Sequence, residues 1–292
     1  MIDFVVYTLI FPGFASAFFA GFIYYGILRK VTAHMQHRIG PPVWQPFLDF
    51  VKLLAKENIT PDDSTGFVMT LCPIVSFASL MTVLVFIPFN GYALVSFSGS
   101  ILIVIYLLVM ASAFIAIAGF ATGNPFGKIG SVRELTQLIA YEFPFIVSLL
   151  TIGFLTNFKV SPFVALQFPF AFVAFVAGMQ GKFSLPPFHI PEAEQEIVAG
   201  PFTEYSGPRL AMFELAKAAS FWVLISLGSV MFMGASNIFA FFINSFVLLF
   251  AVMVMRAVFA RLRIQQAFRL YWFVIAPLAI IDFVRVLTGL YW

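Results

Sequence analysis

The chain has 292 residues, of which 62% are hydrophobic and 10% charged, and its mean hydropathy is +1.01. Soluble domains have about 45–50% apolar and about 25% charged residues, so this composition excludes a soluble globular protein. The net charge is +3, and a single cysteine, Cys72, excludes intrachain disulfides and clusters held by several thiolates. Long apolar runs rather than ~10-residue alternating strands predict an all-α integral membrane protein.

Motifs of soluble-enzyme chemistry are absent from the sequence. It contains no Gly-rich phosphate loop, no His-Glu-x-x-His zinc motif, no nucleophile elbow and no basic patch typical of nucleic-acid binding. We therefore predict no catalytic, cofactor-binding or metal-binding residue in this chain and no nucleic-acid partner.

Apolar runs of the length needed to cross a bilayer, about 20 residues, recur along the whole chain. They predict about eight transmembrane helices in a single polytopic membrane domain, 1–292, of which the fourth and sixth carry charge. The predicted spans are 4–28, 68–89, 100–121, 132–156, 162–180, 204–233, 237–260 and 268–291.

Basic residues collect in alternate loops of this eight-span interpretation. The two exceptions are Lys159, which lies in one of the intervening loops, and Arg285, which lies within the last span. Because positive loops stay in the cytoplasm, we expect the basic loops to face the cytoplasm and both termini to lie outside a cell membrane. The residues that define the cytoplasmic side are Arg29, Lys30, Arg38, Lys52, Lys56, Lys128, Arg133, Lys182, Arg209, Lys217, Arg256, Arg261, Arg263 and Arg269.

The first cytoplasmic loop, residues 29–67, contains an amphipathic segment after the turn signal Gly40–Pro42. At about 15 residues the segment is too short and too charged to span, so it predicts a helix lying in the membrane interface. For this segment alone, docking without a chemical role is the favoured interpretation. Its apolar positions are Val43, Phe47, Phe50, Val51 and Leu54, and its charged positions are Asp49, Lys52 and Lys56.

The fourth predicted span carries a carboxylate inside apolar sequence. Ser131 and Glu134 form a capping-box pattern that predicts the helix start there, which places Glu142 more than two turns inside, next to Tyr141 and close to Pro144. A lone carboxylate at that depth favours its neutral form unless a cation pairs with it. Carboxylates inside spans usually belong to ion or proton paths, so Glu142 is a candidate path residue.

The stretch from Gly181 to Lys217 concentrates charge in this apolar chain. Glu192 and Glu196 are four residues apart and are predicted to share one helix face, where like charges repel and favour shared protons. Glu214 and Lys217, three apart, form either a self-neutralising buried pair or part of a path. An isolated His189 favours titration near neutral pH over metal binding. An ordinary solvated loop is the alternative for the whole stretch.

A basic hook precedes the last span. Arg261, Arg263 and Arg269 lie within nine residues, and such clusters usually anchor topology or contact partners. We therefore expect the hook to be a contact surface rather than part of a path.

The run Pro187–Ser206, PFHIPEAEQEIVAGPFTEYS, resembles the Pro-Phe-Asp-Leu-Pro-Glu-Ala-Glu…Val-Ala-Gly…Thr-Glu-Tyr-Ser signature of one membrane-subunit family. Members of that family join the peripheral and membrane arms of respiratory complex I and of energy-converting hydrogenases. Three further segments agree in order: Gln36–Pro42 continuing to Leu54, Ser131–Glu142, and Arg263–Pro277. The resemblance covers nearly the whole chain.

Departures from the family pattern favour its hydrogenase-type branch, which includes archaeal membrane-bound hydrogenase and sulfane sulfur reductase complexes. The Asp of the central signature is His189 here, and the Asn-Arg pair of quinone-reducing relatives is Ser184 and Leu185. The acidic residue usual late in the sixth span is Lys217. These departures argue against quinone binding.

The resemblance implies a coupling subunit without a cofactor of its own. Its expected partners are hydrogenase-like large and small subunits and an iron–sulfur subunit on the cytoplasmic face, with antiporter-like subunits beside it in the bilayer. Iron–sulfur clusters and a nickel–iron centre would then reside in the partners. The resemblance also implies an acidic funnel built from Glu142, Glu192, Glu194, Glu196 and Glu204.

The sequence therefore predicts a membrane-anchor and coupling subunit of an ion-translocating oxidoreductase that moves protons or sodium. A stand-alone secondary transporter, a quinone-binding subunit of an NADH or F420H2 dehydrogenase, and a structural anchor are the alternatives. The predicted proton or ion path comprises Glu142, Glu192, Glu194, Glu196, Glu204, Glu214, Tyr141, Lys217 and His189. The predicted docking residues, in and beyond loops 29–67 and 181–203, are Arg29, Arg38, Asp49, Arg133, Arg209, Arg263 and Arg269.

Overall fold

A computed structural model describes residues 13–89 and 93–289, and the regular structure within these ranges is helical, apart from isolated bridges such as that between Val164 and Met233. This confirms the all-α prediction. Short helical turns lie at η1 (Ala165–Gln167) and η2 (Gly200–Phe202), and a π-helical segment, η3 (Tyr271–Ile275), joins the last two helices. The α-helices are α2 (Phe14–Met35), α3 (Gln45–Leu54), α4 (Gly66–Phe86), α5 (Ser100–Ala121), α6 (Pro125–Leu155), α7 (Pro169–Lys182), α8 (Glu194–Ile197), α9 (Gly207–Met231), α10 (Ile238–Val258), α11 (Ile264–Leu270) and α12 (Ala276–Leu287).

Six helices of the described chain are long and apolar enough to cross a membrane: α4, α5, α6, α9, α10 and the continuous run from α11 to α12. The membrane class is thus confirmed, but the count of eight is not. The first predicted span, 4–28, begins outside the described residues, and the last, 268–291, ends outside them. The fifth corresponds to α7, whose 14 residues measure about 21 Å, less than the ~30 Å hydrocarbon core.

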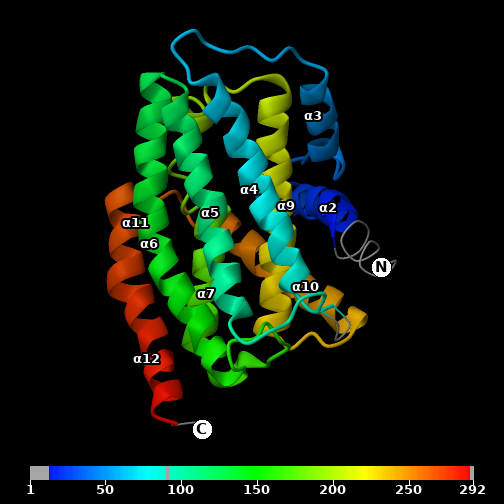
Figure 1. The fold of residues 1–292 in the computed structure, drawn as a ribbon, viewed down its shortest axis with the longest axis vertical. Helices are drawn as coiled ribbons and strands as arrows, with labels where there is room; N and C mark the ends of the chain where they lie inside the picture. The colour runs from blue at the N-terminus through cyan, green and yellow to red at the C-terminus, as the bar shows by residue number, and fades with distance from the viewer. Residues whose placement is uncertain (1–12, 90–92, 290–292) are drawn as a thin grey trace.

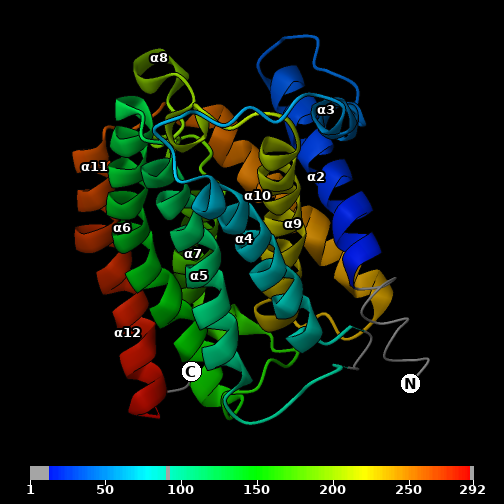
Figure 2. The same cartoon turned by 45° about the horizontal axis from the view of Figure 1, so that its top comes forward.

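The spans form one bundle, in which α9 is the most buried. Figure 1 shows α4, α5 and α6 in a row, with the run from α11 to α12 along the outer flank of α6. Helix α9 packs against α2, α3, α4 and α10. Helices α3 and α8 lie at the same end of the bundle (Figure 2). That end therefore carries the two charged segments noted in the sequence.

The predicted start of the fourth span at Ser131 is wrong. Helix α6 begins six residues earlier at Pro125, because the Asn124 side chain accepts the amide of Phe126 at 2.8 Å and proline suits the first helical position. Glu134 consequently lies in the interior of the helix rather than in its first turn. Glu142 lies about five turns from the helix start.

A close backbone approach fixes α3 against the bundle. A helix lies where the amphipathic segment predicted one, and its Phe47 and Phe50 pack with Phe22 of α2. The turn before α3 reaches α2 at Gly26, where an added Cβ would lie 1.8 Å from the carbonyl oxygen of Val43. Glycine is therefore required at this contact.

We predict that Gly26→Ala destabilises the protein by about 1–3 kcal/mol, since backbone must shift to admit the methyl group. Thermal unfolding in detergent measures the effect. Gly66→Ala is the matched control, because a Cβ there meets a side-chain methyl at an ordinary 3.4 Å. Equal stability of the two variants would contradict the packing described for α2 and α3.

Candidate functional site

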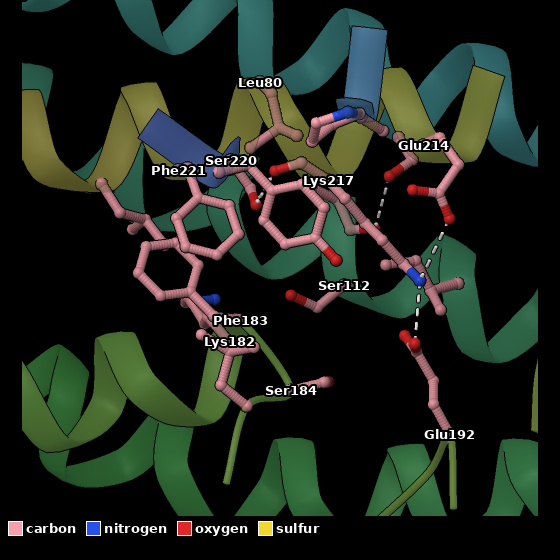
Figure 3. Close-up of a pocket in the computed structure, with 18 of the residues that line it drawn as sticks. Leu80, Ser112, Lys182, Phe183, Ser184, Glu192, Glu214, Lys217, Ser220 and Phe221 are labelled. Carbon is pink, nitrogen blue, oxygen red and sulfur yellow. Dashed lines mark hydrogen bonds and ion pairs between the residues drawn. The ribbon is translucent and has the colours of Figure 1, made fainter. Parts of the chain in front are cut away.

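A cavity of about 640 Å³ lies inside the bundle and is lined by both polar and apolar side chains from α2, α3, α4, α5, α6, α9, α10 and the segment after α7 (Figure 3). Four of the predicted path residues line it, although they come from different segments. The titratable and charged residues of its wall are Tyr25, Arg29, Asp49, Lys52, Lys56, Glu134, Lys182, His189, Glu192, Glu214, Lys217 and Arg256.

Lys217 is the centre of one charge cluster in this wall. Figure 3 shows its ammonium group reaching between Glu192 and Glu214. The Lys217 Nζ lies 2.8 Å from Glu192 Oε2 and 3.6 Å from Glu214 Oε1, and 4.5 Å from the ring centroid of Phe202. Glu214 and Lys217 are thus a pair as predicted, but two carboxylates share one ammonium group. The cluster therefore carries one negative charge in excess.

A second, more deeply buried pair joins Lys182 to Glu142. The Lys182 Nζ contacts Glu142 Oε1, and the two side chains are 3% and 8% exposed. The ammonium group also donates to the Leu108 carbonyl at 3.3 Å and lies 5.3 Å from the centroid of the Tyr141 ring and 5.2 Å from that of Phe145. The candidate path carboxylate is therefore paired. Lys182 lines the cavity, so it connects the cavity to a carboxylate outside its wall.

Glu134 is a cavity residue that the sequence analysis did not select. It is 5% exposed and faces the cavity from α6. Ser131 Oγ, Gln137 Oε1 and Glu142 Oε2 on the same helix are buried and have no hydrogen-bond partner among the described residues. With Glu134 these residues are three, three and five positions apart along α6 and form a polar strip that winds around the helix, because Glu142 lies about 140° from Gln137. The error in the start of α6 hid this strip, because it placed Glu134 at the membrane surface.

The predicted shared face of Glu192 and Glu196 is wrong. Helix α8 spans only Glu194–Ile197, so Glu192 precedes it and turns toward Lys217. Glu196 instead contacts Arg133 and Arg261 at a separate hollow of about 430 Å³, and its side chain is 43% exposed. The side chain of Glu194 lies outside the described part. Glu192 and Glu196, both expected in one acidic funnel, therefore lie at different sites.

The remaining predicted path residues lie at the cavity wall and at a helix cap. His189 lines the cavity, and its Nδ1 is 2.6 Å from the Ser184 carbonyl oxygen. Glu204 accepts a hydrogen bond from the Asn124 side chain, which itself caps α6. His189 therefore joins the central site, and Glu204 has a partner at the start of α6.

The predicted docking residues divide into those with a side-chain partner in this chain and those whose side chains are exposed. Arg29 and Asp49 face each other at 3.5 Å in the cavity wall. Arg209 donates to Thr60 Oγ1 at 2.9 Å. Arg133 pairs with Glu196, as described above. Exposed side chains are those of Arg38, Arg263 and Arg269.

Asp282 is a fully buried carboxylate that the sequence analysis missed. Its Oδ2 accepts the backbone amide of Ala171 at 2.9 Å, and its Oδ1 accepts a hydrogen bond from Arg285 at 2.9 Å. A carboxylate at the first turn of α7 satisfies an amide that the helix leaves free and complements the helix dipole. The sequence signal was the i,i+3 spacing of Asp282 and Arg285 inside the last span.

A double-mutant cycle tests the buried pair. We predict that Lys182→Met destabilises the protein by about 3–5 kcal/mol, because it leaves Glu142 buried without a cation. Lys182→Met combined with Glu142→Gln is expected to recover most of this loss. Chemical denaturation in detergent measures the coupling energy.

Arg29→Gln with Asp49→Asn is the control cycle, since this longer, more exposed pair should couple by less than about 1 kcal/mol. Additive effects of Lys182→Met and Glu142→Gln would refute the pairing.

Comparisons with known proteins agree with this architecture. The family model described as NADH dehydrogenase matches residues 7–287. The H subunit of NADH-quinone oxidoreductase from Bacillus cytotoxicus is 33% identical, with 89% of this chain and 87% of the relative covered. The corresponding protein of Bacillus thuringiensis is 32% identical over the same shares.

A solved structure agrees as well. A chain of the membrane-bound sulfane sulfur reductase, an archaeal respiratory membrane complex, superposes with a TM-score of 0.86 at 27% identity. The superposition covers 93% of this chain and 96% of that one. The chain therefore belongs to the NADH dehydrogenase family of membrane proteins, which includes the H subunit of NADH-quinone oxidoreductase.

Proposed function

We propose that this chain is the non-redox membrane-anchor and coupling subunit of an ion-translocating respiratory oxidoreductase. It would link electron transfer in a hydrogenase-like peripheral arm to proton or sodium translocation. Family membership supports a place in a respiratory membrane complex, since relatives are subunits of an NADH-quinone oxidoreductase and of a respiratory sulfane sulfur reductase complex. The buried contact of Lys182 with Glu142 beside the polar cavity carries the proposal.

The charges around the cavity provide a physical basis for coupling. A carboxylate as buried as Glu142 is stable in its ionised form while Lys182 stays beside it. If a negative charge in the cavity draws Lys182 away, Glu142 must take up a proton, because an unpaired ion there costs several kcal/mol. Glu134 lines the same cavity as Lys182. Ion uptake is thus tied to the position of one ammonium group.

The polar strip of α6 supports a route toward Glu142. Buried polar atoms without protein partners are usually satisfied by ordered water. Ser131, Gln137 and Glu142 supply such atoms along α6, and the cavity residue Glu134 lies between the first two. A water-supported proton path along this strip would connect the cavity to the interior of the bundle.

The proposed topology keeps eight spans, with both termini outside the cell membrane. Helix α2 would complete the first span, α7 would act as a short fifth span, and α3 would lie in the cytoplasmic interface. Helices α3 and α8 at one end of the bundle support a single docking face formed by loops 29–67 and 181–203 (Figure 2). Peripheral subunits would contact three exposed arginines in and beyond these loops, Arg38, Arg263 and Arg269.

We further propose that redox centres reside in partners: iron–sulfur clusters and, in a hydrogenase, a nickel–iron centre. Antiporter-like subunits would flank this chain in the bilayer. A second candidate role, quinone binding, is supported by the size of the cavity and the names of the curated relatives. Ser184, Leu185 and His189 at the cavity wall weigh against it. Cysteine ligands in a co-purified large subunit would identify a hydrogenase.

We predict that Glu142→Gln and Glu192→Gln in the intact complex each lower the number of ions moved per electron pair, because each removes a charge from the proposed path. Ion uptake into vesicles, recorded together with the redox rate, gives this ratio. Glu57→Gln, which changes an exposed carboxylate in the loop after α3, should leave it unchanged. Wild-type ratios in both path variants would rule out the proposed role.

A further inference from the structure

The cavity has a cationic side that the coupling proposal does not use. Arg256, in the last turn of α10, lines this side. Its Nη1 atom is buried and has no hydrogen-bond partner among the described residues. A guanidinium group has five donors and stays charged in proteins, so an unmet donor in a cavity wall marks a place suited to an anion.

Other basic residues belong to the same cavity wall as Arg256. Arg29 of α2 and Lys52 and Lys56 at α3 line the same cavity. The carboxylate among them is Asp49, which is 3.5 Å from Arg29 and also accepts a hydrogen bond from Gln45 at 2.8 Å. The lining contributed by α2, α3, α10 and the loop after α3 thus has four cations and one carboxylate, whereas two of the cavity's other carboxylates, Glu192 and Glu214, are paired with Lys217. Such an excess is stabilised by an anion that accepts several charge-assisted hydrogen bonds, as phosphate oxygens do.

An apolar strip adjoins this cationic side. On α3, Trp44, Leu48 and Val51 recur at helical spacing and are 66%, 48% and 46% exposed. The neighbouring strip of the same helix carries Lys52, Lys56 follows two residues after the helix ends, and a third face is packed against the bundle. Seen along the helix, exposed apolar side chains border the cationic ones directly. This pattern matches an amphiphile with an anionic head and an apolar tail.

We propose that the cavity mouth between α2, α3 and α10 binds an anionic membrane phospholipid. Its phosphate would contact Arg256, Arg29 and Lys52, and its acyl chains would lie along Trp44 and Leu48. The site lies where the apolar run of α10 ends, the level at which headgroups meet hydrocarbon. The exposed apolar strip favours a lipid over free phosphate, and this proposal is independent of the coupling role.

Lipid titration tests the site in the full chain within its purified, delipidated complex. Dioleoyl phosphatidylglycerol is added in mild detergent, and native mass spectrometry counts bound lipid. Arg256→Gln and Lys52→Gln should each weaken binding on the order of tenfold, the loss of one charge-assisted contact. Lys52 is exposed, so its variant is expected to fold. Lys128→Gln, which changes an exposed lysine at the start of α6, is the control and should bind as wild type does.

Two further additions identify the ligand. Dioleoyl phosphatidylcholine, which has no net charge, should bind more weakly, and inorganic phosphate should not displace phosphatidylglycerol at equal concentration. Unchanged lipid binding in both Arg256→Gln and Lys52→Gln would overturn the proposal. Equal binding of the two lipids, or displacement by inorganic phosphate, would also overturn it.

Discussion

One ion pair inside apolar packing determines how this chain can work: the ammonium group of Lys182 against the carboxylate of Glu142. Both side chains are almost fully buried, so the attraction between them offsets a desolvation cost of several kcal/mol for each ion. Neither charge is stable there alone. A change at one is therefore felt at the other, and this property makes the pair suitable for coupling.

The position of Lys182 depends on contacts along the whole of α7. At the start of the helix, Asp282 of α12 accepts the Ala171 amide. Near its end, the Tyr271 hydroxyl donates to the Ala177 carbonyl at 2.8 Å, and the Gln137 side chain donates to the Gly181 carbonyl at 3.1 Å. These contacts come from helices on two sides. They hold this 14-residue helix so that its last residue, Lys182, meets α6.

Local patterns predicted what local physics determines. Hydropathy gave the helical membrane class, amphipathic spacing gave α3, and the i,i+3 spacing gave the contact of Glu214 with Lys217. Glu142 was selected because a carboxylate in apolar sequence is costly. The family resemblance, carried by the motif from Pro187 to Ser206, agrees with the comparisons.

The predictions that failed depend on tertiary contacts or on competing local signals. Lys182 and Glu142 are 40 residues apart, so no periodicity predicts their pairing. At the start of α6 the Asn124 cap prevails over the capping-box pattern at Ser131. Glu196 contacts Arg133 and Arg261, the latter 65 residues away along the chain, and therefore does not lie with Glu192. Sequence reasoning thus found most of the acids and the cation Lys217, but it missed the buried carboxylates of Glu134 and Asp282. It also missed the pairing of Lys182 with Glu142.

Infrared redox difference spectroscopy of the intact complex tests the central claim most directly. If Lys182 and Glu142 act together in coupling, reduction changes the protonated-carboxyl signal of wild type. That change is lost in Glu142→Gln and altered in Lys182→Gln. A wild-type carboxyl signal in both variants would contradict the account, because it would show that this pair keeps its charges throughout the reaction.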